Sequence, residues 1–262
     1  MAKKPKWVVE KEQARRAAAA QSVWLFGLHA VRDALMNPAR RRLRLVVTKN
    51  AADKLADAIA VSGMAPEIAD PRKFPAPLDP GSVHQGAALE VNPLAWPSVE
   101  EICLSGDGPL VLLDRVTDPH NVGAILRSAE VFGARAVIAP ARAAAPETGA
   151  LAKTASGALE RQPYLRVRNL SDTMRQVQGL GFTLLGLDGE AERTLEEGLA
   201  TLEPGRPVGL VLGAEGPGLR EKTRATCDAL VRIQPAGAFG SLNVSNAAAV
   251  ALFAATRMIT SR

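Results

Sequence analysis

The sequence predicts an α/β protein whose larger, C-terminal part is built on a mostly parallel sheet. Over residues 109–262, short apolar runs of strand length alternate with longer segments of helical periodicity. Strands that alternate with helices are typical of a parallel sheet covered on both faces. Polar, glycine-containing loops follow several of the apolar runs. With 262 residues, of which 47% are hydrophobic, the chain is long enough for two ordinary domains with packed cores.

A small α/β/α unit is predicted ahead of that sheet, over residues 23–92. Its first element is a helix in GLHAVRDALMN, where Leu28, Val31 and Leu35 form one apolar stripe. The elements expected after it are a strand at 43–48, a helix at 51–63 that ends at glycine, a short strand at 66–69, a helical turn at 71–74 and a strand at 87–91.

Two irregular segments flank the small unit. Residues 1–22 are rich in Lys, Arg and Ala, and we expect a basic, flexible arm there. Residues 93–108 carry prolines and small loop-forming residues around a short predicted helix at 99–104, so we interpret them as a linker. The second domain then spans residues 109–262.

The second domain is expected to begin with a buried strand, LVLLD at 110–114. The further strands are predicted at 135–139, 165–167, 182–187, 208–212 and 229–233. The helices between and after them are predicted at 121–132, 151–159, 170–180 and 246–259.

Positive charge is concentrated at the start of the chain. Residues 1–50 hold 12 Lys and Arg against 3 Asp and Glu, a net of +9, and the remaining residues hold 20 against 24, a net of −4. The basic stretch includes the run of arginines at 40–44. Such asymmetry indicates a polyanionic partner, most often nucleic acid. Charge alone leaves a solvated, solubilising surface as an equal alternative.

Several protein classes find no support in the composition. No apolar run has the length of a membrane span, and the first residues have no apolar stretch of the signal-peptide type, so we expect a cytoplasmic protein. Cys103 and Cys227 are far apart, and the three histidines are scattered. We therefore expect neither a disulfide framework nor a metal site.

Three polar stretches of the second domain carry the candidate chemistry. They are DRVTDPHNVGAILRSA at 114–129, LVLGAEGPGL at 210–219 and IQPAGAFGSLNVSNAAAV at 233–250. Each contains or follows a predicted strand and leads toward a helix. In open α/β sheets, ligands bind at loops that follow the carboxyl ends of strands. We therefore expect the three loops to form one active site.

Each loop also has a purely structural interpretation when it is taken alone. Asn121 can cap the helix that follows it, and Ser241, Asn243 and Ser245 can do the same at the last helix. The glycines around Glu215 can simply form a turn. Their spacing is not the dinucleotide-binding fingerprint, which argues against a nicotinamide-dependent dehydrogenase.

Taken together, the three loops resemble one family. The patterns DxVxDPxNxGAxxRSA, LGxEGxGL and SLNVSxAxA, in this order, are similar to those of the SpoU/TrmH class of RNA 2′-O-ribose methyltransferases, within the SPOUT group. Upstream, VHQG at 83–86 and GLHAV at 27–31 resemble the ribosomal-protein-like RNA-binding domain of one branch. That branch methylates a guanosine of large-subunit rRNA. The resemblance covers residues 24–262.

The resemblance implies properties that spacing alone does not show. The catalytic domain of the family has a C-terminal trefoil knot, its methyl donor is S-adenosyl-L-methionine, and it works as a homodimer with active sites near the subunit interface. In this sequence the positions that match the donor-binding residues are Leu212, Gly213, Ile233, Leu242 and Ser245. The positions that match the catalytic residues are Asn121, Arg127, Glu215, Ser241 and Asn243.

Two departures from the family pattern are visible. Gln234 and Pro235 stand where the rRNA branch usually has Pro-Met, which affects the edge of the donor pocket. Asn246 stands where valine is common, at a helix start that accepts asparagine. Neither change removes a position with a catalytic match.

Arg127 matches the arginine that acts on the ribose 2′-OH proton. Arginine is normally protonated, so it serves as a base only where its surroundings favour the neutral form. Alternatively Arg127 stabilises the developing alkoxide and binds phosphate, while water takes the proton. Both roles stay open at the level of sequence. His120 is adjacent to Asn121, but a turn residue without a known geometry is a weak candidate for a base.

The leading hypothesis is a methyltransferase for large-subunit rRNA, because the two-domain layout favours that branch. The alternatives are a tRNA 2′-O-methyltransferase and a non-catalytic RNA-binding factor in ribosome assembly. The presence of Arg127, Glu215, Ser241 and Asn243 favours an active enzyme over the latter.

Overall fold

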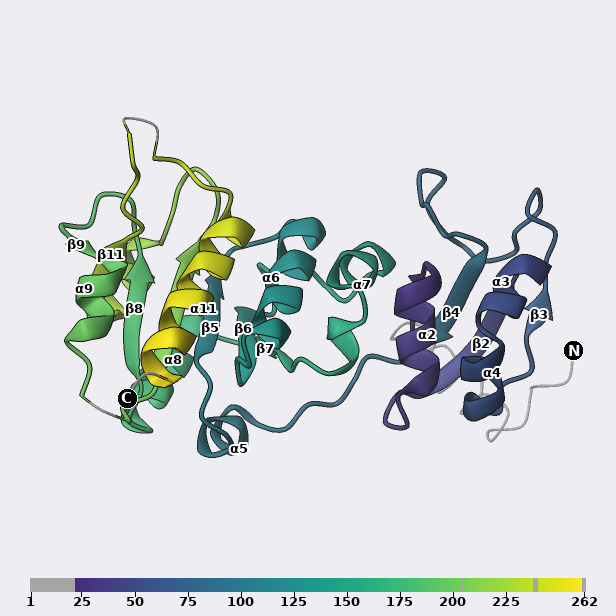
Figure 1. The fold of residues 1–262 in the computed structure, drawn as a ribbon, viewed down its shortest axis with the longest axis horizontal. Coiled ribbons are helices and arrows are strands. Elements are labelled where there is room, and N and C mark those ends of the chain that lie inside the picture. The colour runs from purple at the N-terminus through teal and green to yellow at the C-terminus, as the bar shows by residue number, and fades with distance from the viewer. Residues whose placement is uncertain (1–21, 204, 238–239, 261–262) are drawn as a thin grey trace, which may run out of the picture. The chain divides into compact units, whose positions relative to one another are not determined.

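The computed structural model describes residues 22–203, 205–237 and 240–260. The chain divides into two compact units (Figure 1). Unit 1 comprises residues 1–95 and 147–153, and unit 2 comprises residues 96–146 and 154–262. The predicted basic arm lies outside the described residues, apart from Ser22. No helix within the described ranges combines the length and the hydropathy that crossing a membrane requires.

Unit 1 contains a four-stranded sheet. Its strands are β1 (Val23–Phe26), β2 (Arg42–Val47), β3 (Glu67–Ile68) and β4 (Ala87–Val91), arranged in the order β1-β4-β2-β3. The central strand β4 pairs antiparallel with β1 and β2, while β3 pairs parallel with β2. The predicted strands are confirmed within about a residue at each end, but β1 was not predicted. Four apolar residues ahead of a helix give little signal, because the partner of β1 lies some sixty residues later.

The helices of unit 1 are α2 (Leu28–Met36), α3 (Lys49–Lys54) and α4 (Ala56–Ser62). The single helix predicted at 51–63 is therefore wrong in one respect, since the chain breaks at Leu55 (φ −106°, ψ 7°). Its end at Gly63, which has a left-handed φ of 67°, is as predicted. No helix forms at 71–74, because the side chain and the carbonyl of Asp70 accept hydrogen bonds from the next backbone N–H groups and make a turn instead.

Unit 2 contains a seven-stranded sheet in which every pairing is parallel. The strand order is β7-β6-β5-β10-β8-β11-β9, so β7 and β9 are the edge strands. The strands are β5 (Leu110–Asp114), β6 (Ala136–Pro140), β7 (Tyr164–Val167), β8 (Thr183–Leu187), β9 (Arg193–Thr194), β10 (Val208–Gly213) and β11 (Ala229–Arg232). The predicted α/β class with a parallel sheet is confirmed.

Helices connect these strands. They are α5 (Val99–Leu104), α6 (Pro119–Val131), α7 (Gly149–Ala155), the 3-10 helix η1 (Ala158–Glu160), α8 (Leu170–Gly179), α9 (Leu195–Ala200), α10 (Glu221–Thr226) and α11 (Val244–Thr260). The first residues of α7 lie in the 147–153 segment of unit 1. The sequence analysis missed β9, α9 and α10. For α9 a signal existed, since Thr194 and Glu197 form a capping box.

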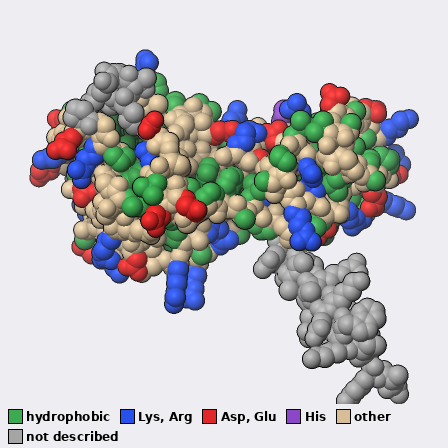
Figure 2. All heavy atoms as spheres, turned by 90° about the horizontal axis from the view of Figure 1, so that it is seen from below, with side chains coloured by type: hydrophobic (Ala, Val, Ile, Leu, Met, Phe, Trp, Pro, Cys, Tyr) green, Lys and Arg blue, Asp and Glu red, His purple; other side chains and the backbone are tan. Residues whose placement is uncertain are grey.

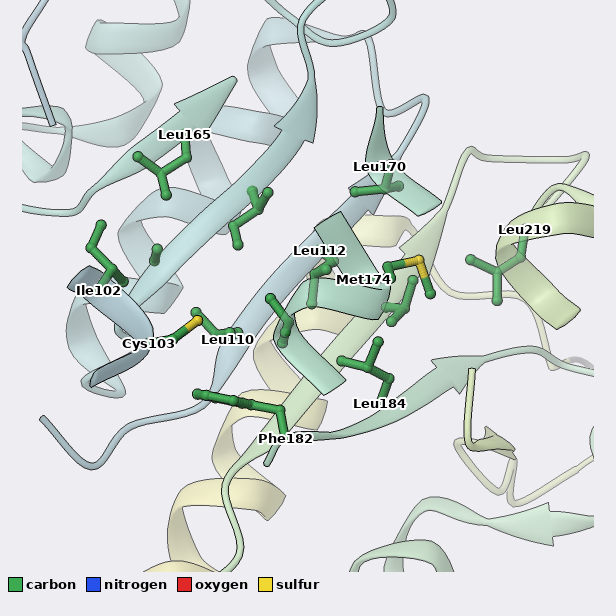
Figure 3. Close-up of a cluster of buried hydrophobic side chains, with 14 residues drawn as sticks. Ile102, Cys103, Leu110, Leu112, Leu165, Leu170, Met174, Phe182, Leu184 and Leu219 are labelled. Atoms are coloured by element: carbon green, nitrogen blue, oxygen red, sulfur yellow. The ribbon is translucent and has the colours of Figure 1, made fainter. Parts of the chain in front are cut away.

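A buried apolar cluster lies on one face of the sheet of unit 2 (Figure 3). Leu110 and Leu112 of β5 meet Met174 of α8 and Phe182 there. Ile102 and its neighbour Cys103 in α5 belong to the same cluster. The segment at 93–108 that we interpreted as a linker therefore contributes side chains to the core of unit 2. Burial raises the pKa of the Cys103 thiol, although nearby Arg135 opposes this effect.

The arginine run of unit 1 is largely bound to the protein itself. The side chain of Arg40 is fully buried, with one nitrogen 2.8 Å from the carbonyl oxygen of Asn92 and 3.5 Å from a carboxylate oxygen of Glu147. Arg42 donates to the carbonyl oxygen of Leu35 at 2.5 Å. Arg44 pairs with Glu67 at 2.8 Å. On the face drawn in Figure 2, positive and negative side chains are interspersed.

Candidate functional site

The loop after β10 is a tight glycine turn. A β-carbon on Gly213 would lie 2.1 Å from the carbonyl carbon of Gly218, so a larger residue has no room there. Gly216 and Gly218 have left-handed φ angles of 82° and 66°. The backbone N–H of Gly218 donates to the carbonyl oxygen of Ala214 at 3.0 Å. These contacts fix the loop that carries Glu215.

Asp114 holds the far end of this loop. It is the last residue of β5, is fully buried, and pairs in register with Gly213 of β10. Its two carboxylate oxygens accept hydrogen bonds from the backbone N–H of Arg220 at 2.9 Å and from the Nε of Arg220 at 2.8 Å. Sequence analysis did not name Asp114 as a site residue. The signal was a carboxylate that ends an otherwise apolar strand, because a buried charge needs a partner.

The three predicted loops bring Asn121, Glu215 and Asn243 into one hydrogen-bonded cluster. Glu215 Oε1 accepts from Asn121 Nδ2 at 3.3 Å, from the backbone N–H of Val244 at 3.4 Å, and from Asn243 Nδ2. Asn243 Nδ2 also donates to Asn121 Oδ1 at 2.9 Å. No described residue bonds to Oε2 of Glu215. One carboxylate oxygen is therefore fixed, and the other is available to a ligand.

The role predicted for Asn121 as a helix cap is wrong. Asp118 caps α6, because its side chain accepts the backbone N–H of His120 at 3.0 Å, and Pro119 occupies the first helical turn. Asn121 lies inside that turn and is buried. Its side-chain amide therefore does not cap the helix and instead donates a hydrogen bond to Glu215.

A pocket adjoins this cluster at the carboxyl ends of β8, β10 and β11. Four residues predicted to bind a donor line it, namely Leu212, Gly213, Ile233 and Leu242. Glu215 and Val244 line it as well. The fifth predicted residue, Ser245, does not line the pocket. Its backbone N–H and its hydroxyl bond to Asn243 Oδ1 at 2.9 and 2.5 Å, so it orients the Asn243 side chain.

Leu187, the last residue of β8, and the next two residues, Asp188 and Gly189, form a wall of the pocket that sequence analysis missed. Asp188 on this wall pairs with Arg224 and also accepts the backbone N–H of Glu190 at 2.9 Å. Its position was readable from the sequence, because an Asp-Gly pair ends a predicted strand of the same sheet. The rule that ligands bind at the carboxyl ends of parallel strands therefore also predicts the loop after β8, to which we did not apply it.

Arg127, Ser241 and His120 lie outside the polar cluster. Arg127 follows Asn121 by six positions on α6, which corresponds to about 240° around the helix axis and about 9 Å along it. It is exposed and forms no hydrogen bond or ion pair with a described residue. Ser241 is also exposed. His120 Nδ1 lies 3.2 Å from the hydroxyl oxygen of Thr154.

The described part of the chain contains neither a cluster of metal-binding side chains nor a reactive thiol. No group of three or more His, Cys, Asp or Glu side chains there could hold a metal ion. Burial, together with the negative charges of Asp228 and Asp114, raises the pKa of the Cys227 thiol to about 12. This thiol therefore stays protonated near neutral pH and is a poor nucleophile.

Comparison with family models matches both units. The SpoU rRNA Methylase family matches residues 108–253, and a model for RNA 2′-O ribose methyltransferase substrate binding matches residues 24–97. Among curated relatives, 23S rRNA (guanosine-2′-O-)-methyltransferase RlmB of Salmonella typhimurium is 38% identical over 247 residues, covering 91% of this chain and 100% of its own length. RlmB of Escherichia coli K12 is 39% identical over 244 residues, covering 90% and 98%.

A similar protein is found among solved structures. The SpoU methyltransferase AviRb from Streptomyces viridochromogenes, in complex with AdoMet, superimposes with a TM-score of 0.77 at 25% identity. The match covers 93% of this chain and 92% of that one. A putative RNA methyltransferase of the TrmH family from Porphyromonas gingivalis matches with a TM-score of 0.72 at 27% identity, covering 91% of each chain.

Proposed function

Because the chain belongs to the SpoU rRNA methylase family, we propose that it methylates the ribose 2′-hydroxyl of a guanosine in 23S-type rRNA. As a member of this family it is an RNA 2′-O-methyltransferase, and its methyl donor is S-adenosyl-L-methionine. The choice of a guanosine in large-subunit rRNA rests on the relatives named RlmB, which match nearly the whole chain. The observation that carries the proposal is the Asn121–Glu215–Asn243 cluster beside a glycine-lined pocket.

The pocket residues fit the methyl donor. Leu212, Ile233 and Leu242 offer apolar contacts to an adenine ring, and the bare backbone at Gly213 allows a ligand to approach closely. When bound, the donor supplies an electrophilic methyl group on a sulfonium. The tight turn from Gly213 to Gly218 keeps the pocket wall and Glu215 in one fixed arrangement, so the acceptor site is preorganised.

The polar cluster is proposed to bind the target ribose. Glu215 Oε1 is held by two side-chain amides and one backbone N–H, which leaves Oε2 to accept a hydrogen bond from a ribose hydroxyl. Asn121 and Asn243 fix the carboxylate in this orientation, and Ser245 in turn fixes Asn243. Holding the hydroxyl in line with the methyl group is the main way in which such a site accelerates transfer. Ser241, which is exposed on the same loop, is proposed to contact the substrate.

Arg127 is proposed to act on the 2′-oxygen, either as the base or by stabilising the developing alkoxide. Its guanidinium has no partner among the described residues and is therefore free to meet a substrate. In the chain by itself it lies on another face of α6 than Asn121 does. We propose that a homodimer brings the two together at the subunit interface.

Exposed apolar side chains support such a homodimer. Val131 on α6, together with Val250 and Phe253 on α11, is exposed by 42 to 71%, and α6 and α11 contact each other. Arg127 and Val131 are four positions apart, so they share one face of α6. A second copy that covers these apolar residues would bury them and would place Arg127 at the interface.

Unit 1 is proposed to bind the rRNA, as the substrate-binding model at residues 24–97 suggests. Residues 1–22 are proposed as a basic arm, residues 23–92 as the RNA-binding domain, 93–108 as a connection, and residues 109–262 as the catalytic domain with a C-terminal trefoil knot. The return of α11 to pack on β10 and α6, after β11 has crossed beyond β8, supports a knotted path. We also propose a cytoplasmic location, because the proposed substrate is rRNA.

Transfer of labelled methyl groups to in vitro transcribed 23S rRNA tests the proposed function. Nuclease digestion and nucleoside analysis should find the label in 2′-O-methylguanosine, and the Glu215→Gln variant should lose most of it. Label in tRNA but not in rRNA would overturn the choice of substrate. Binding of S-adenosyl-L-methionine without transfer to any RNA would indicate an assembly factor instead.

A further inference from the structure

A cluster of arginines lies at the β6–β7 end of the sheet in unit 2. Arg166 belongs to the edge strand β7, Arg168 follows it directly, and Arg142 follows the end of β6. All three are exposed. Arg142 and Arg168 form no ion pair with a described residue, and Arg166 donates only to the carbonyl oxygen of Ala141. These three residues are called the edge arginines below.

The strand pairing holds the edge arginines close to one another. Pro140 pairs with Val167 in register, and the backbone N–H of Ala141 donates to the carbonyl oxygen of Val167 at 2.7 Å. Arg142 and Arg168 therefore follow two paired strands whose backbones lie about 5 Å apart. The same backbone contact thus brings the two segments that carry Arg142 and Arg168 side by side.

The alternation of side chains along β7 directs Arg166 away from the buried core. Leu165 and Val167 pack against the buried cluster of unit 2. Arg166 alternates with them and therefore points to the opposite side, while Arg168 follows β7 in a bend and is exposed. No ion pair with a described acidic residue holds any of the three edge arginines.

The sheet order relates this cluster to the active site. All strands are parallel, so their carboxyl ends lie on the same side of the sheet. The donor-side pocket lies at the ends of β8, β10 and β11, while Asn121 follows β5. In the sheet order, β6 lies next to β5 and β7 lies next to β6, and these two strands carry or precede the edge arginines. Along the carboxyl ends of the strands, the donor pocket thus lies on one side of β5 and the edge arginines lie on the other.

We propose that the edge arginines bind phosphates of the substrate RNA beside the target nucleotide. This inference rests on the proposed function, and it adds a contact within unit 2 to the substrate binding expected of unit 1. Guanidinium groups bind phosphate oxygens with paired hydrogen bonds. Phosphate contacts fix the position of a nucleic acid without reading its sequence. They would hold the flanking strand while the target ribose meets Glu215.

The salt dependence of RNA binding tests this inference. We would prepare Arg142→Gln and Arg168→Gln separately and together, with Arg193→Gln as the matched control. Arg193 is an exposed arginine on β9, the opposite edge strand, and its side chain forms no hydrogen bond or ion pair with another described residue. Affinity for in vitro transcribed 23S rRNA would be measured at several salt concentrations for each variant.

Each edge substitution should lower the slope of log affinity against log salt by about 1, and the double variant by about 2. The Arg193→Gln slope should equal that of the wild type. Donor binding and turnover at saturating RNA should stay unchanged in all variants, whereas the KM for RNA should rise in the edge variants only.

Wild-type slopes in the double variant, or an equal drop in the Arg193→Gln control, would overturn the inference. Either result leaves the proposed function intact as long as the wild type methylates rRNA. A wild type that does not methylate rRNA contradicts the proposed function itself, so the two failures are distinguishable.

Discussion

The arginines of unit 1 and those of unit 2 differ in what surrounds them. Arg40 and Arg42 lie in the basic run near the start of the chain, but both donate to carbonyl oxygens of their own unit. Arg127, Arg142 and Arg168 are scattered through a part of the sequence with a net negative charge, yet they are exposed and unpaired among the described residues. A run of positive charge in a sequence therefore does not identify a surface that binds RNA.

Physical chemistry explains the difference. A fully buried guanidinium is tolerated only when its donors are satisfied, and the contacts of Arg40 with Asn92 and Glu147 do this. Such a group is unavailable to RNA. An exposed guanidinium keeps its donors for a ligand. Contacts with the protein, rather than position in the sequence, separate structural arginines from those that are available to a ligand.

The largest effect is expected from removing Arg40. The Arg40→Ala substitution leaves the Glu147 carboxylate without this partner and opens a space in unit 1, so it should destabilise the fold by about 3–5 kcal/mol. Chemical denaturation measures this change. The matched control is Arg41→Ala, the exposed neighbour, which should change stability by less than about 0.5 kcal/mol. Equal effects of the two substitutions on stability would contradict the structural role of Arg40.

The Arg127→Ala substitution should act on turnover and not on stability. A cation that meets charge formed only in the transition state contributes to rate rather than to donor affinity. Loss of one such group costs about a hundred- to a thousandfold in rate. Labelled methyl transfer and equilibrium donor binding should be compared with those of Arg193→Ala. Near-normal turnover would remove Arg127 from the catalytic residues and shift attention to Glu215 or His120.

A smaller effect is expected at Asn243. Its amide bonds to both Asn121 and Glu215, so Asn243→Ala frees the carboxylate to rotate. Loss of a hydrogen bond to a charged group costs about 1.5–3 kcal/mol, which corresponds to about a ten- to hundredfold loss in methyl transfer. Ser245→Ala removes only the hydroxyl that orients Asn243 and should cost less. A Ser245→Ala variant as impaired as Asn243→Ala would contradict the proposed order of roles.

The smallest effect concerns the partly buried thiol of Cys227. Its pKa is raised from 9.0 to about 12, so the folded protein holds this proton more tightly than the unfolded chain does. The resulting stabilisation is fully present below pH 9 and is lost as the pH rises toward 12. Iodoacetamide at pH 8.5 should therefore modify Cys227 slowly in the native protein and rapidly in denaturant. Rapid native alkylation would show that the site is open.

The parts of the site that follow from sheet topology were predictable from sequence. Asn121, Glu215 and Asn243 lie in three segments that follow strands of one parallel sheet. The rule that ligands bind at the carboxyl ends of such strands was therefore enough to bring them together. The same rule covered Asp188, although we did not apply it there. The position of Ser245 outside the pocket was not predictable, because it depends on a hydrogen bond to Asn243.

Two features that the sequence analysis missed depend on contacts that are distant in the sequence. β1 exists because Val23 to Phe26 pair with β4, and no local pattern contains that partner. Arg40 is structural because Glu147, more than a hundred residues later, lies beside it. Sequence periodicity indicates local structure and burial. Contacts between residues that are distant in the sequence can be predicted only from a family resemblance.

Mapping 2′-O-methylation in 23S rRNA tests the central claim most directly. The protein's gene would be deleted in its own host, and the rRNA compared with that of strains complemented by the wild type or by Arg127→Ala. We predict that one guanosine loses its 2′-O-methyl group in the deletion strain, regains it with the wild type, and stays unmodified with Arg127→Ala. An unchanged methylation map of 23S rRNA in the deletion strain would contradict this account.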